Sequence, residues 1–419
     1  MTLSFILRAF YVSIISINKN QHDAGNPEGD GHLAYISFFT DKISLPDFDV
    51  STVDQFWHPP LHYIISGRFL EAAWKLFPNE SGNYEIAQAL PLLYVTISIF
   101  LIWKVLAHVF EDKMTQNIGL IFVAFQPTFI IRSATINNDA LTTLISIAII
   151  YFLLRYIESS DFKWFFIMLF LFILGMWTKK TIALSAIPVT IIFLWEYIHK
   201  ENKNIIKSTI MFLIFSPITF AWYIYHKLKW GIPFGFVWHL ESQYDAPGYI
   251  ENTSIWDRIT DFSIAHFSYQ NVFVGTNTEA VDINPLTVLI KTGANELWHW
   301  TYYNDGIKKL SYILLMLRLI TTILIVIGGI LFTVDKKINT KLKICFSSFA
   351  IANVISFYIF AFDNPYISSM DYRYIEAIML CEAIYFAYLA DKNKYLKCTA
   401  LIFAAICALV SAAKIVCLS

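Results

Sequence analysis

The chain has 419 residues, of which 57% are hydrophobic and only 15% are charged, and its formal net charge is -1. Soluble domains are roughly a quarter charged, so this composition predicts an integral membrane protein. The near-neutral charge argues against a nucleic-acid partner, which would require a basic face. All five cysteines lie beyond residue 344 in hydrophobic surroundings, which favours buried thiols over a disulfide framework.

Eleven hydrophobic stretches approach the roughly 17–25 residues that a bilayer-spanning helix needs. They are 3–17, 86–107, 117–132, 140–157, 163–178, 181–198, 208–226, 311–333, 344–362, 374–390 and 398–416. The predicted fold class is therefore an all-α polytopic membrane protein with about eleven transmembrane helices. The first stretch lacks the basic start and the cleavage site of a secretory signal, so we expect an uncleaved helix.

Lysine-rich short loops predict the orientation, because such loops are typical of the cytoplasmic side. They hold Lys200, Lys203 and Lys207, then Lys336, Lys337, Lys341 and Lys343, then Lys392, Lys394 and Lys397. With eleven spans and the N-terminus inside, two long segments, 18–85 and 226–310, become outer loops of a single membrane domain, 1–419. Segment 61–77 contains three charged residues, so we expect a juxtamembrane helix on the outer surface rather than a span.

Four positive charges lie at predicted outer helix ends, against the charge bias: Arg132, Lys179, Lys180 and Arg373. Snorkelling to the interface explains any one of them. Four on one rim, near acidic groups, favour an anion site, and a lipid phosphate is the natural anion there.

Acidic residues lie on the same predicted rim. Asp23, Glu28 and Asp30 belong to the first outer loop, and Asp139 follows the third span. The sequence Asn-Asn-Asp at 137–139 also suits a helix N-terminus, and a capping residue at the membrane edge can face a cavity as well.

Five short motifs occur in a characteristic order. They are the acidic segment before His32-Leu33-Ala34-Tyr35-Ile36, with Leu45-Pro46 after it; His58-Pro59-Pro60-Leu61-His62-Tyr63; Gln126-Pro127 with Ser133 and Asn137-Asn138-Asp139; Trp177-Thr178-Lys179-Lys180-Thr181; and Met370-Asp371-Tyr372-Arg373-Tyr374-Ile375. Together they resemble the polyprenyl-phosphate-sugar-dependent glycosyltransferases of the GT-C fold, in particular the family 39 protein mannosyltransferases and the aminoarabinose transferases.

The resemblance implies an inverting transfer of a sugar from undecaprenyl or dolichyl phosphate to an acceptor protein, lipid or cell-envelope glycan. It implies Asp30 as the general base. Relatives often have an adjacent acidic pair at this place, which this chain lacks, so Glu28 and then Asp23 are the alternatives to Asp30. Asp139 would orient the acceptor or His32. The implied substrate-binding residues are His58, His62, Arg132, Lys179, Lys180, Arg373 and Tyr374.

Two alternatives stay open. His32, His58 and His62 beside Asp30 could bind a divalent cation, although a hydrogen-bonded histidine network is simpler and no metal ligand is assigned. A transporter or flippase of a lipid-linked glycan would show internal repeats and mid-membrane charges, and neither is evident in the sequence. We expect a bacterial inner or plasma membrane with the active site outside, or the ER membrane in a eukaryote.

Overall fold

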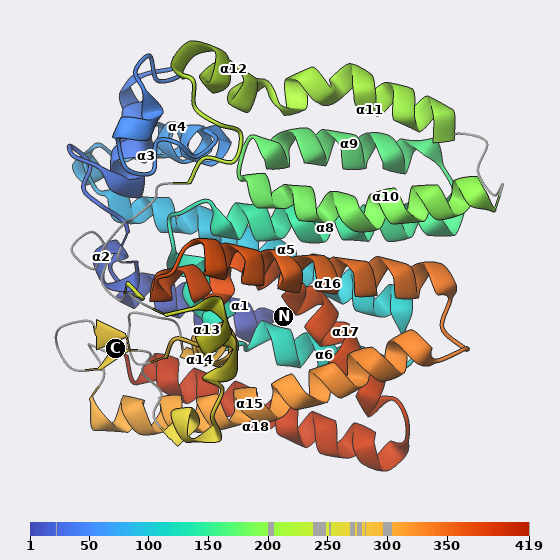
Figure 1. The fold of residues 1–419 in the computed structure, drawn as a ribbon. Coiled ribbons are helices and arrows are strands. Elements are labelled where there is room, and N and C mark those ends of the chain that lie inside the picture. The colour runs from blue at the N-terminus through green and yellow to red at the C-terminus, as the bar shows by residue number, and fades with distance from the viewer. Residues whose placement is uncertain are drawn as a thin grey trace. The chain divides into compact units, whose positions relative to one another are not determined.

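The computed structural model of the protein describes residues 1–21, 23–199, 205–237, 249–250, 253–268, 273–274, 279–280, 282–295 and 304–418. These residues are almost entirely helical (Figure 1). The strands among them are β1 (Phe273–Val274) and β2 (Glu279–Ala280), which pair antiparallel. The predicted all-α membrane class is confirmed.

Six helices of the described residues are long and apolar enough to cross a membrane. They are Tyr84–Val109, Asp139–Ser159, Lys180–Ile198, Asp305–Val334, Thr340–Asp363 and Lys394–Val416. Two pairs qualify only together, and they are Lys113–Ala124 with Pro127–Ala134, bent by 63°, and Ile206–Thr219 with Ala221–Trp230, bent by 46°. The described residues thus contain six candidate spans, or up to eight, and the predicted count of eleven is not confirmed.

The difference comes from short and broken helices. The stretches 3–17, 163–178 and 374–390 correspond to helices of 13, 15 and 12 residues. A straight helix needs about 20 residues to cross the hydrocarbon core, so none of these three helices has that length by itself.

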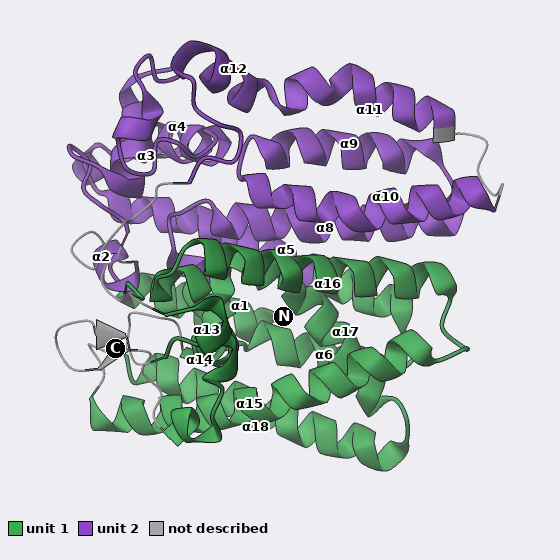
Figure 2. Cartoon of the chain, in the orientation of Figure 1, with its two compact units in different colours: residues 1–14, 102–131, 239–419 green, residues 15–101, 132–238 purple. Residues whose placement is uncertain are grey.

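The chain divides into two compact units (Figure 2). Unit 1 comprises residues 1–14, 102–131 and 239–419, and unit 2 comprises residues 15–101 and 132–238. The helix α5 (Ala89–Val109) begins in unit 2 and ends in unit 1. Each unit is described by itself below.

Unit 2 contains the first predicted outer loop. Its elements are α2 (Ile17–Asn20), α3 (Gly31–Asp41), η1 (Val50–Thr52), α4 (Leu61–Leu76), η2 (Pro78–Glu80), η3 (Tyr84–Gln88), η4 (Arg132–Ala134), α8 (Asp139–Ser159), α9 (Phe162–Met176), η5 (Lys180–Ile182), α10 (Ala183–Ile198), α11 (Ile205–Thr219) and α12 (Ala221–Trp230). Helix α8 packs against α9 and α10, α9 packs against α11, and α3 packs against α4.

Helix α4 is the predicted juxtamembrane segment. Its buried residues include His62, Tyr63, Ser66 and Leu70, whose spacing places them on one helical face. Gly67 lies on the same side, and a Cβ there would approach the Ile36 carbonyl oxygen to 2.7 Å, so glycine permits the close contact between α3 and α4. The position of α4 relative to a membrane stays a prediction.

Unit 1 contains the C-terminal helices. Its elements besides β1 and β2 are α1 (Thr2–Ile14), α6 (Lys113–Ala124), α7 (Pro127–Ile131), α13 (Ile255–Thr260), η6 (Ile264–Ser268), α14 (Pro285–Asn295), α15 (Asp305–Val334), α16 (Thr340–Asp363), η8 (Ile367–Met370), η9 (Tyr372–Ile378), α17 (Met379–Ala390) and α18 (Lys394–Val416). Helix α17 packs against α6 and α15, while α14 and α18 both pack against α15.

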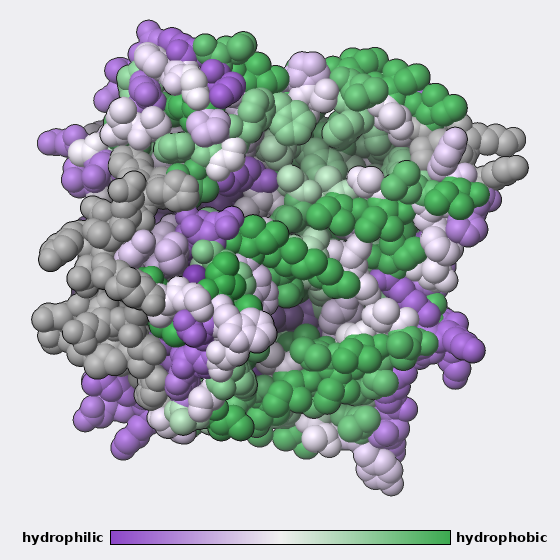
Figure 3. Space-filling view, viewed as in Figure 1, coloured by the Kyte–Doolittle hydropathy of each residue, from purple (hydrophilic) through white to green (hydrophobic). Residues whose placement is uncertain are grey.

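Exposed apolar side chains cover the middle of the candidate spans, and hydrophilic residues gather towards the helix ends (Figure 3). On α15, for example, Ile320, Ile323, Val326, Ile327 and Ile330 are all more than 40% exposed. Such a surface is stable against lipid chains and costly in water.

Candidate active site

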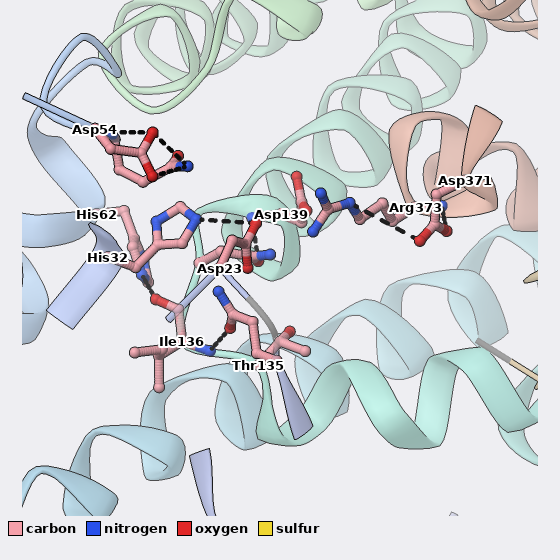
Figure 4. Close-up of polar contacts among 12 residues, drawn as sticks. Asp23, His32, Asp54, His62, Thr135, Ile136, Asp139, Asp371 and Arg373 are labelled. Carbon is pink, nitrogen blue, oxygen red and sulfur yellow. Dashed lines mark hydrogen bonds and ion pairs between the residues drawn. The ribbon is translucent and has the colours of Figure 1, made fainter. Parts of the chain in front are cut away.

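The centre of the site in unit 2 is His32, in the first turn of α3. Its Nδ1 atom lies 2.8 Å from the hydroxyl of Tyr63, and its Nε2 atom lies 3.5 Å from Oδ2 of Asp23 (Figure 4). Burial raises the pKa of Tyr63 well above its usual range, so the phenol stays protonated and can donate a hydrogen bond to Nδ1. An ionised carboxylate only accepts hydrogen bonds, so Nε2 of His32 is expected to face Asp23 as an N–H group.

The segment between Asp23 and His32 folds into a tight loop. Gly25 and Gly31 both have positive φ angles, +67° and +82°, and their backbones cross so closely that a Cβ on Gly25 would lie 1.9 Å from the carbonyl oxygen of Asp30. The crossing leaves Asp23 half-buried, whereas Glu28 and Asp30 are exposed. Asp30 is the N-cap residue of α3, and its side chain makes no capping hydrogen bond.

Aromatic rings surround His32. The His58 ring stacks on His32 with centroids 6.0 Å apart, and Trp57 lies 3.8 Å from His58. On the other side, Tyr63 stacks on Tyr35 at 4.1 Å. These buried contacts limit how far His32 can rotate.

A second carboxylate, Asp54, lies close enough to interact electrostatically with His32 and Asp23. Burial raises the pKa of Asp54, and the negative charge of Asp23 adds to the shift, while His32 and the hydrogen bonds from Gln55 oppose it. Asp54 and Asp23 therefore lie near the same imidazole, and proton binding at Asp54 depends on the charges of both neighbours.

His62 and its neighbour Leu61 connect the start of α4 to other segments of unit 2 by hydrogen bonds. The Nε2 atom of His62 lies 2.7 Å from the carbonyl oxygen of Ile136 (Figure 4). The backbone N–H of Leu61 donates to the carbonyl oxygen of Trp177 at 2.9 Å. The motif at 58–63 thus contacts the segment that leads into Asp139 at the start of α8 and the segment after α9 that contains Lys179.

Asp139 forms an ion pair with Lys179, and both side chains are mostly buried, with exposed fractions of 5% and 12%. The preceding residue, Asn138, donates from Nδ2 to the carbonyl oxygen of Thr178 at 3.0 Å. Adjacent residues of the two segments are therefore paired.

Lys180 has different partners. Its ammonium group donates to the carbonyl oxygens of Gly235 and Phe236, at 3.1 and 3.2 Å. Neutral carbonyl groups hold the side chain in place without neutralising its charge, unlike the carboxylate that faces Lys179.

Burial keeps two of the histidines neutral. It lowers the pKa of His58 well below its usual range, and the positive charge of Lys179 adds to this effect. Burial likewise lowers the pKa of His62 to about 4, against the hydrogen bond to Ile136. Neutral imidazoles can donate and accept hydrogen bonds, as sugar hydroxyls require.

The structure brings together six predicted residues in unit 2: His32, His58, His62, Asp139, Lys179 and Lys180. Arg132 also belongs to this unit, where it is buried and donates to the Thr135 hydroxyl at 3.4 Å. Sequence reasoning did not single out Asp54 or the hydroxyl of Tyr63, although Tyr63 ends the motif at 58–63.

Arg373 and Tyr374 belong to unit 1. The backbone N–H of Arg373 donates to Oδ1 of Asp371 at 2.9 Å (Figure 4). The guanidinium of Arg373 lies 5.2 Å from the ring centroid of Tyr374. The Nε atom of Arg373 lies 4.0 Å from Oδ2 of Asp371. The acid of the motif at 370–375 thus orients its arginine.

Within the described ranges, no group of three or more His, Cys, Asp or Glu side chains is arranged to hold a metal ion. A cavity of about 20 Å³ in unit 1 is bordered by Gln126, Arg318 and Ser411, among others. That volume suits a single water molecule and is too small for a sugar or a lipid headgroup.

The chain is similar to solved structures and to a family model. Across 99% of its length the chain is similar to the structure of ArnT from Cupriavidus metallidurans in the apo state, with a TM-score of 0.51, 10% identity and 75% coverage of that protein. The same protein bound to undecaprenyl phosphate matches with a TM-score of 0.40, at 11% identity over 92% of this chain and 76% of that one. The first likeness shows that the chain has the ArnT-like GT-C fold.

Residues 58–222 match the family model described as dolichyl-phosphate-mannose-protein mannosyltransferase. No curated protein matches the chain in sequence. The predicted resemblance and the predicted class are confirmed: the chain is a membrane glycosyltransferase of the kind that uses a lipid-phosphate-linked sugar donor. The matched region contains the motif at 58–63 as well as Asp139, Lys179 and Lys180.

Proposed function

We propose that the enzyme moves a sugar from undecaprenyl or dolichyl phosphate to a hydroxyl or similar nucleophile of an acceptor protein, lipid or cell-envelope glycan. The reaction is a single displacement at the anomeric carbon, so it inverts the configuration there. It takes place on the outer face of the membrane, the side to which the first long loop, 18–85, is predicted to belong because the short lysine-rich loops are assigned to the other side.

The general base in this proposal is Asp23, with Asp30 and Glu28 as its competitors. The observation that carries the assignment is the contact between Asp23 and His32, which places one carboxylate of the loop against the buried ring cluster. A general base must reach the proton that it removes, and Asp23 is the loop carboxylate in contact with His32. Asp30 and Glu28 are exposed.

His32 acts as a positioning residue for this base. With its Nδ1 atom facing the Tyr63 hydroxyl, the ring directs Nε2 at Asp23, to which it donates as an N–H group in this proposal. That hydrogen favours the ionised carboxylate, which is the form that accepts the acceptor's proton as the new glycosidic bond forms.

Lys180 stabilises the departing lipid phosphate. When the bond from the anomeric carbon to the phosphate oxygen breaks, the electron pair stays on that oxygen and adds negative charge. A lysine held only by neutral carbonyl groups can approach this charge without first breaking an ion pair. Lys179 stays paired with Asp139 and keeps that carboxylate in position.

The proposal is tested with purified protein in lipid nanodiscs, a radiolabelled undecaprenyl-phosphate sugar and membrane extracts as the source of acceptor. Transfer is expected to release undecaprenyl phosphate, and the product linkage is expected to be inverted when analysed by NMR. Movement of the intact labelled lipid across the bilayer, with no cleavage of the sugar, would instead identify a flippase.

A further inference from the structure

A buried ion pair lies within the helical core of unit 1. Arg318 of α15 donates to Glu382 of α17 through both terminal nitrogens, at 2.8 and 2.7 Å. Less than a tenth of either side chain is exposed. Both helices carry apolar sequences, and charges in such surroundings are costly, so a pair kept there points to a role.

The pair supports the motif at 370–375 through Tyr372. The guanidinium carbon of Arg318 lies 4.8 Å from the ring centroid of Tyr372, which is itself 1% exposed. The backbone N–H of Tyr372 donates to the hydroxyl of Thr292 on α14 at 3.0 Å. Tyr372 is thus held by its ring and by its backbone.

The next residue, Arg373, is oriented from its other side. Asp371 accepts its backbone N–H, and the ring of Tyr374 lies against its guanidinium. The carbonyl group of Tyr372 and the N–H of Arg373 lie in one peptide plane, so holding Tyr372 restricts where the backbone of Arg373 can lie.

We propose that the Arg318–Glu382 pair is a positioning device that sets Tyr372, and through it Arg373, for the phosphate of the lipid donor. This inference rests on the proposed function and on the predicted assignment of Arg373 to that phosphate. A pair that served stability alone could be exchanged for apolar residues without loss, because the desolvation of two charges offsets most of their attraction.

The test exploits that difference. In the double variant Arg318→Met/Glu382→Met no charge is left unpaired, so the thermal unfolding temperature should stay close to that of the parent protein. Binding of undecaprenyl phosphate, measured by native mass spectrometry in detergent, should weaken about tenfold, the size of one lost charge-assisted hydrogen bond. Adding Arg373→Gln to the double variant should weaken binding little further.

The matched control is the double variant Asp335→Asn/Lys392→Met. It removes the ion pair of 2.9 Å between Asp335, which follows α15, and Lys392, which lies just beyond α17. This variant should bind the lipid as the parent does, which separates positioning from a general loosening of the two helices.

The outcomes are distinct. If Arg373→Gln weakens binding but Arg318→Met/Glu382→Met does not, the positioning role is wrong and the proposed function stands. If Arg373→Gln itself leaves binding unchanged, the assignment of Arg373 to the phosphate is wrong. Should the double variant fail to fold, Tyr372→Leu decides, because it removes the stacked ring and leaves both charges paired; unchanged binding in that variant would also overturn the inference.

Discussion

The hydroxyl of Tyr63 lies 2.8 Å from Nδ1 of His32. This contact sets the tautomer of the imidazole and therefore what its opposite face presents to Asp23, 3.5 Å away. A tyrosine on α4 thus helps to orient the imidazole that lies beside a carboxylate of the loop before α3.

Replacing Tyr63 with phenylalanine tests this arrangement. The ring still stacks on Tyr35, so we expect a loss of stability of only about 1 kcal/mol. Sugar transfer should fall about tenfold, because His32 is then free to adopt the other tautomer and Asp23 loses an oriented N–H group. Thermal unfolding and single-turnover transfer measure the two effects, and parent-like transfer would show that the tautomer is irrelevant.

The two lysines at 179 and 180 should behave differently. Lys179→Met leaves the buried Asp139 without its ion-pair partner, which costs about 3 kcal/mol of stability. Lys180→Met should unfold at nearly the parent temperature and raise the KM for the lipid donor, because only neutral carbonyl groups lose a partner. Equal stability losses in the two variants would contradict the distinction.

His62 makes stability depend on pH. Its pKa is lowered by burial to about 4 in the folded protein, against a usual value of 6.5. Between these two values the unfolded chain binds a proton that the folded chain does not, so stability falls as the pH falls, by about 1.4 kcal/mol per pH unit. His62→Gln should flatten the unfolding temperature between pH 6.5 and about 4, and an unchanged slope would argue against this origin.

Gly293 tests the packing around Arg318. A Cβ at this position would lie 2.9 Å from Nε of Arg318, whose terminal nitrogens are held by Glu382. Gly293→Ala should therefore lower stability by about 1–3 kcal/mol and weaken binding of undecaprenyl phosphate. Parent-like behaviour in both assays would mean that Arg318 can shift without consequence.

Much of the site follows from the sequence, because polar residues stand out against apolar helices. The motif at 58–63 and the pairs at 138–139 and 178–179 lie close together within unit 2, as their shared position at helix ends suggests. Their partners could not be predicted, since the ion pair of Asp139 with Lys179 joins residues 40 positions apart in the chain.

The acidic loop shows where sequence reasoning reaches its limit. Distance along the chain favours Asp30 as the partner of His32, because only one residue separates them. The crossing of Gly25 and Gly31 reverses that order in space and places Asp23 beside the ring. A close backbone approach of this kind depends on φ angles that composition does not reveal.

The predicted count of eleven spans is not confirmed, for a related reason. Hydropathy measures how apolar a stretch is, and α17 is apolar because it is buried among other helices of unit 1. Only 12 residues long, it is too short to cross a bilayer as a straight helix.

The most direct measurement compares Asp23→Asn with Asp30→Asn in transfer from a radiolabelled undecaprenyl-phosphate sugar, with lipid binding recorded in parallel. Loss of a general base costs about 10²–10⁴-fold, so Asp23→Asn should lower the rate by that amount while binding of the lipid stays near the parent value. Asp30 is exposed, and Asp30→Asn should lower the transfer rate far less. Full activity in Asp23→Asn, together with loss of transfer in Asp30→Asn, would contradict the account.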